Sequence, residues 1–498
     1  MDRLSRAIDY RIEVIFGQPL DSTKDPTSEP ALSTEQVDEA LASFGDVTEN
    51  VVHNLALAQK FIAPCFPPEY NIFPFFVSRF HQAMFKHTQR LLQGSVDGGI
   101  ILDLLRVSQE YNITVCQSLG IPQEWLEPKL LQGKDEALIQ EYLSIVRRKL
   151  REWMDNLMVT ETQEFTSRTK PPELDADGLY CLQASVIMFQ IVNEQVDLAC
   201  EANRGRLVLD VVGECQTIFR STQQQWKQLI NSEYRRQVTQ PDDVPAGLVD
   251  YIIALANDQL RSAEHTENVL QRACETVNRS HQDRLQADLT ASMDGFLAIA
   301  QLCCTTLAQI VYNDVTPVFQ QLFTPAWYKE DIMQAVVLTL QDYTSDFRGH
   351  LNGFLCDKVI KDLLEWYSIN YLDSVHNKHA RFTRPASVEK FKSDIQAAEE
   401  YFKSCLAPEV VDEWLQPLRQ TCALIESSPT LIFLDFYSMK KQYPDLPLSF
   451  VKDILQKRED VDKSQVKEIM ETLTSKVKND ASTGLHNRQT IFSKLSNY

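Results

Sequence analysis

The chain has 498 residues, of which 44% are hydrophobic and 24% are charged, the balance of a folded protein and not of a disordered one. Only 15 glycines are present, which argues against glycine-rich phosphate loops and tight β-turns and favours helices joined by short connections. The net charge of −20 disfavours nucleic acid and anionic membranes as partners, so we expect a protein partner.

The cysteine and hydropathy patterns indicate a reducing, cytosolic setting. The 11 cysteines form no CxxC pair, and an odd number in a large chain argues against a disulfide framework. The first residues lack the apolar region and cleavage site of a signal peptide. The most apolar stretch, Leu424 to Tyr437, is interrupted by Glu426, Pro429 and Asp435, and no run of 18 apolar residues exists. We therefore expect no membrane span.

The first third of the chain is predicted to contain a helix, a linker and a helical bundle. Residues 18–30 are polar and proline-bearing, so 1–34 is expected to be an N-terminal helix followed by a flexible linker. Ser33 and Gln36 then form a capping-box pattern. Apolar residues recur at intervals of three and four in the segments that follow, which predicts a bundle over 35–165. Its helices are expected at 37–62, 75–92, 100–119 and 136–160.

A proline-bearing break at 165–178 precedes the next part of the chain, and a second one at 237–247 interrupts it. A second bundle is predicted over 175–322, because apolar periodicity of three and four returns after the first break. Its helices are expected at 179–202 and 206–234, followed by two long helices that cover 248–277 and 285–310. Leu207 to Val212 could form a strand, but its Gln-rich continuation favours a helix.

A third bundle is predicted over 326–430. Thr324 suits a helix N-cap and Pro325 suits the first helical position. The run from Trp327 to Val375 is helical in pattern, and Gly349 and Gly353 mark a kink or a junction between two helices. A polar loop at 376–385 precedes further helices at 388–406 and 408–426.

The chain is predicted to end in a small helical bundle over 431–480, with a frayed tail at 481–498. The helices of this bundle are expected at 430–442, 448–458 and 463–478. No fixed-period repeat is present, so helical repeat arrays are not supported. The fold class is therefore predicted to be all-α, an elongated rod of consecutive antiparallel helical bundles.

The sequence assigns no catalytic, cofactor-binding or metal-binding residue. The short signatures of phosphate-binding loops, zinc proteases, serine hydrolases and kinases are all missing. His376 and His379 form an HxxH pair that could hold a metal ion. No third ligand is near in the sequence, and the neighbouring Lys378 and Arg381 are cationic, so a solvated loop is favoured.

Two other residue types could carry chemistry. Cys303 and Cys304 lie in an apolar helical run, and at least one of them is expected to pack in the core. The acidic pairs at 242–243 and 399–400 could serve as general acid and base, but such chemistry needs perturbed pKa values in a cleft. We expect both pairs to be solvated.

Basic residues concentrate in two places, Arg147-Arg148-Lys149-Arg151 and the segment from Lys378 to Lys392. A solvated face is the favoured interpretation of both. Contact with an acidic partner helix comes next, and an anionic lipid comes last. Interleaved aromatic residues for base stacking are largely lacking, which again disfavours nucleic acid.

Three strings in the second half of the chain resemble one family. They are IVYNDVTPVFQQLFTPAWY (Ile310–Tyr328), TLQDYTSDFRGHLNGFLCDKVIKDLLEWYSINYLDSV (Thr339–Val375) and FKSDIQAAEEYFKSC (Phe391–Cys405). Together they resemble the C-terminal portion of the third exocyst component in its fungal form, a subunit of the vesicle-tethering complex of exocytosis. The resemblance covers 35–480 and is strongest from 250 to 430.

This resemblance implies a rod of helical bundles without enzymatic activity or a cofactor. It implies a scaffold subunit that docks secretory vesicles at the plasma membrane through contacts with other exocyst subunits, and with SNARE proteins or their regulators. The expected localisation is cytoplasmic, peripheral at plasma-membrane sites of secretion. Family members carry further N-terminal helices, so most of that portion is expected to be missing from this chain.

Two other classes of function stay open. A stand-alone helical adaptor or membrane-remodelling relative of the tether family would be monomeric and would bind lipid through the basic segments. An all-helical enzyme of the terpene-cyclase type needs an Asp-rich motif that faces a cavity. The nearest string, Asp242-Asp243-Val244-Pro245, ends in proline and lies in a break, so this class is disfavoured.

Overall fold

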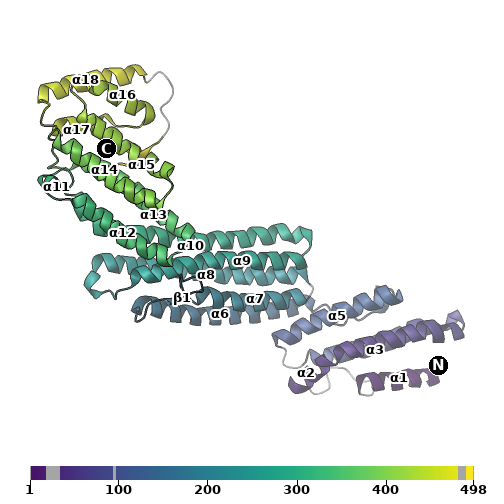
Figure 1. Cartoon of the computed structure of the whole chain (residues 1–498). Helices are drawn as coiled ribbons and strands as arrows, with labels where there is room; N and C mark the ends of the chain where they lie inside the picture. The colour runs from purple at the N-terminus through teal and green to yellow at the C-terminus, as the bar shows by residue number, and fades with distance from the viewer. Residues whose placement is uncertain (1, 18–33, 94–96, 203, 481–488, 497–498) are drawn as a thin grey trace. The chain divides into compact units, whose positions relative to one another are not determined.

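The computed structural model describes residues 2–17, 34–93, 97–202, 204–480 and 489–496, and helices dominate these residues (Figure 1). This confirms the all-α prediction for the described part of the chain. The chain divides into two compact units. Unit 1 comprises Met1–Val159, Val186–Thr222 and Glu264–Asp294, and unit 2 comprises Thr160–Ser185, Gln223–Ala263 and Gly295–Tyr498.

The helices follow one another with short connections. The first half contains α1 (Asp2–Phe16), α2 (Thr34–Ala42), α3 (Phe44–Leu57), α4 (Ile72–Leu91), α5 (Gly98–Leu119), α6 (Asp135–Ser167), α7 (Ala184–Glu201) and α8 (Gly205–Thr239). The second half contains α9 (Leu248–Thr276), α10 (Arg279–Phe319), α11 (Pro325–Lys329), α12 (Ile332–His350), α13 (Gly353–Asp373), α14 (Ala386–Cys405), α15 (Pro408–Glu426), α16 (Ile432–Gln442), α17 (Leu448–Lys457) and α18 (Lys463–Asp480). Short 3-10 or π turns lie at η2 (Ala58–Ile62), η3 (Ala63–Cys65), η4 (Pro68–Tyr70), η5 (Gln123–Trp125), η6 (Pro241–Asp243), η7 (Ser374–His376) and η9 (Ile491–Lys494).

In unit 1, α1, α3, α4 and α5 bury their apolar stripes against one another. The side chain of Asp97 caps α5 by accepting a hydrogen bond from the Ile100 amide at 3.0 Å. Gly120 ends the same helix at φ +60°, a left-handed conformation that glycine adopts without steric cost. Val51, Phe80 and other apolar side chains then form a continuous core between these helices.

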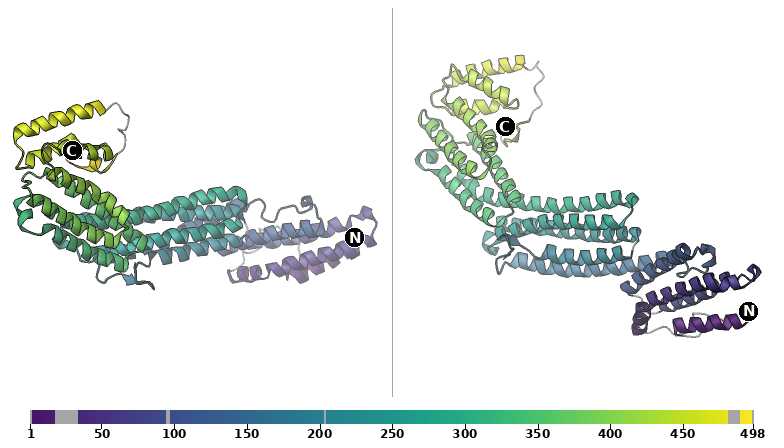
Figure 2. Two further views of the ribbon diagram at one scale, coloured as in Figure 1. Left: turned by 45° about the horizontal axis from the view of Figure 1, so that its top comes forward. Right: turned by 45° about the vertical axis from the view of Figure 1, so that its right-hand side comes forward.

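In unit 2, α12, α13, α14 and α15 lie side by side, and all views of the ribbon show this packing in green (Figures 1 and 2). Their interface is aromatic. Tyr371 of α13 contacts Phe391 of α14 edge-on at 4.9 Å between ring centroids, and Tyr367 of α13 contacts Phe402 of α14 edge-on at 5.8 Å. Such ring pairs add specific geometry to the large apolar area that each ring removes from water.

The linker predicted at 165–178 is partly wrong, because α6 continues to Ser167 and a hairpin follows. No glycine or proline interrupts the helix before Pro171. Strand β1 (Glu173–Leu174) then pairs antiparallel with β2 (Tyr180–Cys181). The Asp175 carboxylate accepts from the amides of residues 177 and 179, which closes the turn.

The structure confirms the helix junctions predicted in the third bundle. The helix α12 ends at His350 and α13 begins at Gly353, so the two glycines mark a junction. The helix α11 begins at Pro325 with Thr324 at the N-cap position. The Thr324 hydroxyl donates to the Gln321 carbonyl at 2.7 Å, so it makes no capping hydrogen bond.

The frayed tail predicted at 481–498 is wrong for residues 489–496. Ile491, Phe492 and Leu495 are buried, and the Phe492 ring lies 5.4 Å from the ring centroid of Tyr443. These closely spaced apolar residues form one turn, η9, whose burial offsets the entropy of ordering the chain end. Residues 481–488 and 497–498, the linker at 18–30 and the capping residue Ser33 lie outside the described residues.

One helix among the described residues, α10, is long and apolar enough to cross a membrane by length and composition alone. The expectation of no membrane span, which considered unbroken apolar runs, missed this helix. Of its most apolar window, 56% is buried inside the protein. Cys303 and Leu307 lie on the buried side, so packing against neighbouring helices explains the apolar composition of α10.

Candidate interaction surfaces

The residues that could carry chemistry do not assemble into a catalytic site in the described part of the chain. No group of three or more His, Cys, Asp or Glu residues is placed to hold a metal ion there. His376 and His379 are both exposed in or beside η7, as predicted for a solvated loop. The Nδ1 atom of His376 lies 2.8 Å from a carboxylate oxygen of Asp453.

The paired cysteines are core residues, as predicted. Cys303 and Cys304 are fully buried in α10. Burial raises the pKa of Cys304 to about 12, because the thiolate would lose its hydration. A thiol that stays protonated at neutral pH is a poor nucleophile and a poor metal ligand.

The predicted acidic pairs are solvated or paired. Asp242 and Asp243 are exposed in η6. Glu399 accepts a hydrogen bond from Lys403 at 2.7 Å and another from Arg419 at 2.7 Å, and these cations lower its pKa. A carboxylate held ionised by two cations stabilises the α14–α15 contact and is unsuited to proton transfer.

The structure reveals three buried carboxyl groups with raised pKa values that sequence reasoning missed. Burial raises the pKa of Glu161 to about 8, and the nearby Asp258 carboxylate adds to the effect. Burial also raises the pKa of Asp258 to about 6, although Asp258 accepts from the Ser185 amide at 3.1 Å. Neither of the grooves described below includes these residues. They are therefore features of the core.

The third buried carboxyl group, Asp394, joins the three strings that resemble one family. Its Oδ2 atom accepts from Trp327 Nε1 at 2.7 Å and from the Tyr371 hydroxyl at 2.8 Å. Burial outweighs these two hydrogen bonds and raises the pKa of Asp394 to about 6. Each residue comes from a different string, so the strings meet at one polar point inside an aromatic core.

The basic segment from Lys378 to Lys392 is partly neutralised within unit 2. Arg384 lies 3.0 Å from Asp460, Lys390 lies 2.6 Å from Asp331, and Lys392 lies 2.9 Å from Glu426. The three acidic partners come from other segments of unit 2. The sequence of 378–392 therefore shows the basic residues without the carboxylates that pair with them. These pairs compensate three of the five Lys and Arg residues of the segment, and Lys378 and Arg381 have no ion-pair partner among the described residues.

The other basic cluster stays largely unpaired. We call Arg147, Arg148, Lys149 and Arg151 the α6 patch. Arg147 makes a bidentate contact with Glu214 of α8, with N–O distances of 2.8 and 2.5 Å. Arg148, Lys149 and Arg151 are exposed, and they have no ion-pair partner among the described residues.

The α6 patch borders a shallow surface hollow of about 560 Å³. Three arginines of the patch line it, together with Glu152 and Asp155. The carboxylates of Glu152 and Asp155 lower the net charge of this surface, but the surface stays positively charged. The patch is therefore a local cationic exception on a chain whose net charge is −20.

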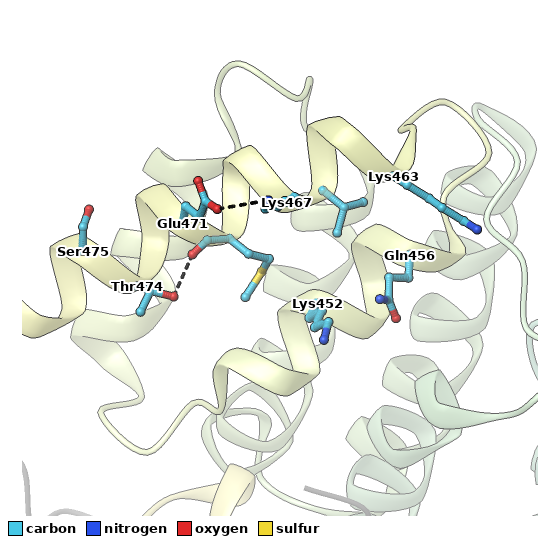
Figure 3. A pocket seen from close by; sticks show the side chains of 9 residues that line it. Lys452, Gln456, Lys463, Lys467, Glu471, Thr474 and Ser475 are labelled. Carbon is cyan, nitrogen blue, oxygen red and sulfur yellow. Dashed lines mark hydrogen bonds and ion pairs between the residues drawn. The ribbon is translucent and has the colours of Figure 1, made fainter.

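A second cationic surface lies between α17 and α18 and was not found from the sequence. Figure 3 shows Lys463, Lys467 and Glu471 on one helix and Lys452 on the other, facing an open groove. The groove holds about 650 Å³ and is also lined by Val466 and Met470. We call it the α17–α18 groove. Its lysines alternate with acidic residues along the chain, so no basic run marked it.

Comparison with known proteins finds a matching family and several similar proteins. The family model described as exocyst complex component Sec6 matches residues 22–463. Exocyst complex component sec6 of Schizosaccharomyces pombe is 29% identical over 423 residues, which cover 84% of this chain and 56% of that protein. Exocyst complex component SEC6 of Saccharomyces cerevisiae is 25% identical over 453 residues, which cover 86% and 56% respectively. The chain thus spans little more than half the length of these curated relatives.

Two solved structures share the fold. The crystal structure of the C-terminal domain of the exocyst subunit Sec6p has a TM-score of 0.65 at 24% identity and covers 72% of this chain and 96% of that domain. The crystal structure of M-Sec has a TM-score of 0.66 at 16% identity and covers 99% of this chain and 80% of that one. At these identities the two likenesses concern the fold alone. With the family match over residues 22–463, the chain belongs to the Sec6 family of exocyst components.

Proposed function

We propose that the chain is a non-enzymatic subunit of the exocyst, which scaffolds the docking of secretory vesicles at the plasma membrane through protein contacts. The family match over residues 22–463 carries this proposal. The partners are other exocyst subunits, together with SNARE proteins or their regulators. The chain acts in the cytoplasm and reaches plasma-membrane sites of secretion through these partners.

A protein-binding role also agrees with which reactive side chains are buried and which cationic side chains are exposed. The carboxyl groups of Glu161, Asp258 and Asp394, whose pKa values burial raises, lie in the core, and burial keeps the thiols of α10 protonated. The unpaired cations of the α6 patch are exposed, where they can meet an acidic surface. We retain bundles at 35–165, 175–322, 326–430 and 431–480 as the proposed division of this scaffold.

Affinity purification of the whole chain from native extract, followed by mass spectrometry, tests the proposal. We expect the chain to recover several exocyst subunits. We also expect the triple substitution Arg148→Glu, Lys149→Glu, Arg151→Glu to lower that recovery about tenfold at physiological salt, because each reversed charge weakens a contact with an acidic partner. Recovery of no exocyst subunit by the unsubstituted chain would refute the proposed function.

A matched control separates the α6 patch from net charge. Lys129, Lys134 and Arg220 are exposed residues of unit 1 outside the patch. Their triple substitution to Glu changes the net charge equally and should leave recovery unchanged. Equal loss in both variants would reject the patch as a contact surface. If the variant of the α6 patch lost binding to anionic vesicles but still recovered exocyst subunits, the stand-alone membrane adaptor would be favoured.

A further inference from the structure

The α17–α18 groove combines positive charge with an apolar floor. Val466 is 7% exposed and Met470 is half-buried, so both present apolar atoms between the two helices. Lys452 and Lys463 are exposed at the rim. Lysine stems can cover apolar surface while the ammonium groups stay in water. The groove therefore offers an apolar centre and a cationic rim to the same ligand.

The rim charges are available to a partner. Lys452 and Lys463 have no ion-pair partner within the described residues. Lys467 lies 3.9 Å from Glu471, with 80% and 70% of these side chains exposed (Figure 3). An exposed pair at this distance contributes at most a few tenths of a kcal/mol, so Lys467 can exchange Glu471 for a carboxylate of a partner.

The dimensions of the groove suit a helix. The lining residues of α18 recur from Lys463 to Ser475 at intervals of three and four, which is one face of the helix. At about 1.5 Å per residue this face is about 18 Å long, the length of roughly three helical turns. A partner helix with apolar residues at the same spacing would set them against Val466 and Met470.

The apolar floor and the spacing of the lysines favour an amphipathic helix over a single phosphate group. The positively charged residues that line the groove are all lysines, which attract carboxylates and phosphates alike as point charges. Lys452 lies on α17, whereas Lys463 and Lys467 lie one turn apart on α18, so the charges are spread along the groove. A phosphate group would also leave the apolar floor without a contact.

We propose that the α17–α18 groove binds an acidic amphipathic helix of a partner protein. Apolar side chains of that helix cover Val466 and Met470, and its flanking carboxylates meet Lys452, Lys463 and Lys467. Methionine can adjust to partner side chains of different shape, which suits such a surface. This inference rests on the proposed binding role of the chain, but it does not depend on which exocyst subunit is the partner.

A peptide titration on the whole purified chain tests the inference. The probe is a labelled synthetic peptide of about 18 residues, with leucine at helical spacing of three and four and glutamate on the flanks. We expect saturable binding in fluorescence anisotropy. A scrambled peptide of the same composition should bind at least about tenfold more weakly, because its leucines share no helical face.

Substitutions locate the binding site. Lys463→Glu with Lys467→Glu should weaken peptide binding about tenfold, and Met470→Asp should weaken it by itself. The control Lys361→Glu with Lys441→Glu has the same net charge, lies outside the groove and should bind as the unsubstituted chain does. Circular dichroism should show unchanged helix content in the lysine variants, because the substituted side chains are exposed, and in Met470→Asp, because that side chain is only partly buried.

The possible outcomes separate this inference from the proposed function. Equal binding of the ordered and scrambled peptides, or equal loss in groove and control variants, would overturn it. If anionic vesicles displaced the peptide and bound the chain more tightly than the peptide does, the inference would be overturned in favour of a lipid site. Failure to recover exocyst subunits from extract would refute the proposed function but leave the peptide result intact.

Discussion

Glu161 should make the protein less stable as the pH rises through neutrality. It lies in α6, is 7% exposed, and has no hydrogen-bond or ion-pair partner among the described residues. Burial, with smaller effects from Asp258 and Glu164, raises its pKa from 4.5 to about 8. Between these two values the folded state holds a proton that the unfolded state has lost, so stability falls with rising pH.

The size of the effect follows from that pKa. Each pH unit between 4.5 and 8 costs about 1.4 kcal/mol, which amounts to about 3 kcal/mol at pH 7. Glu161→Gln removes the ionisable group and keeps its shape. We expect it to stabilise the protein by about 2–3 kcal/mol at pH 7 and by less than about 1 kcal/mol at pH 5.

Urea unfolding at several values between about pH 5 and pH 8 measures this effect on the free energy of unfolding. Hydrogen exchange of peptides that cover 160–168 and 255–263 then shows whether the change lies near Glu161. Glu141→Gln, at an exposed position of the same helix, is the control and should change neither stability nor its pH dependence. Asp258 also has a raised pKa and contributes the same sign in all variants, so the difference between Glu161→Gln and the unsubstituted chain measures Glu161 together with its repulsion of the Asp258 carboxylate. Parallel pH profiles for the two proteins would refute the reasoning.

Two further substitutions test buried polar contacts in unit 2. Arg168→Met removes one of the two cationic partners of Glu233, whose side chain is 2% exposed; Arg168 lies 2.8 Å and Arg236 lies 2.5 Å from its carboxylate. Because Arg236 remains, we expect the free energy of unfolding to fall by about 2–4 kcal/mol in urea denaturation, and a loss below about 1 kcal/mol would contradict this. Asp394→Ala leaves the donors of Trp327 and Tyr371 unsatisfied and should lower the free energy of unfolding in urea by about 2–4 kcal/mol. Asp394→Asn keeps an acceptor and should lower it by less. Equal losses in the two variants would show that the hydrogen bonds contribute little.

Local sequence signals predicted most helix bounds, because breakers and periodicity act over a few residues. The helix α15 spans the predicted 408–426, and glycines mark the α12–α13 junction as expected. The hairpin at 173–181 was missed because its strands are two residues long and carry no alternating pattern. The turn is closed by the carboxylate of Asp175, which also pairs with Arg261 of α9 at 2.7 Å, a contact that local sequence does not show.

The interaction surfaces were harder to predict, because charge compensation depends on residues distant in the sequence. The two basic concentrations looked alike, yet Asp331, Glu426 and Asp460 pair with three basic residues of one of them. The α17–α18 groove has no basic run at all, and only the packing of two helices brings its lysines together. The buried Glu161 left a detectable signal, since it continues the spacing of Met154, Met158 and Phe165 on one helix face.

The residues that reveal the family and the residues that we propose to bind partners belong to different classes. The family strings meet at Asp394, where Trp327 and Tyr371 satisfy a buried carboxyl group. Replacing any one of the three leaves a donor or an acceptor unpaired, so the set is constrained together by the core. Exposed lysines such as Lys463 carry no such constraint from the fold. The strings therefore identify the scaffold, and the partners are better sought through uncompensated surface charge than through the strings.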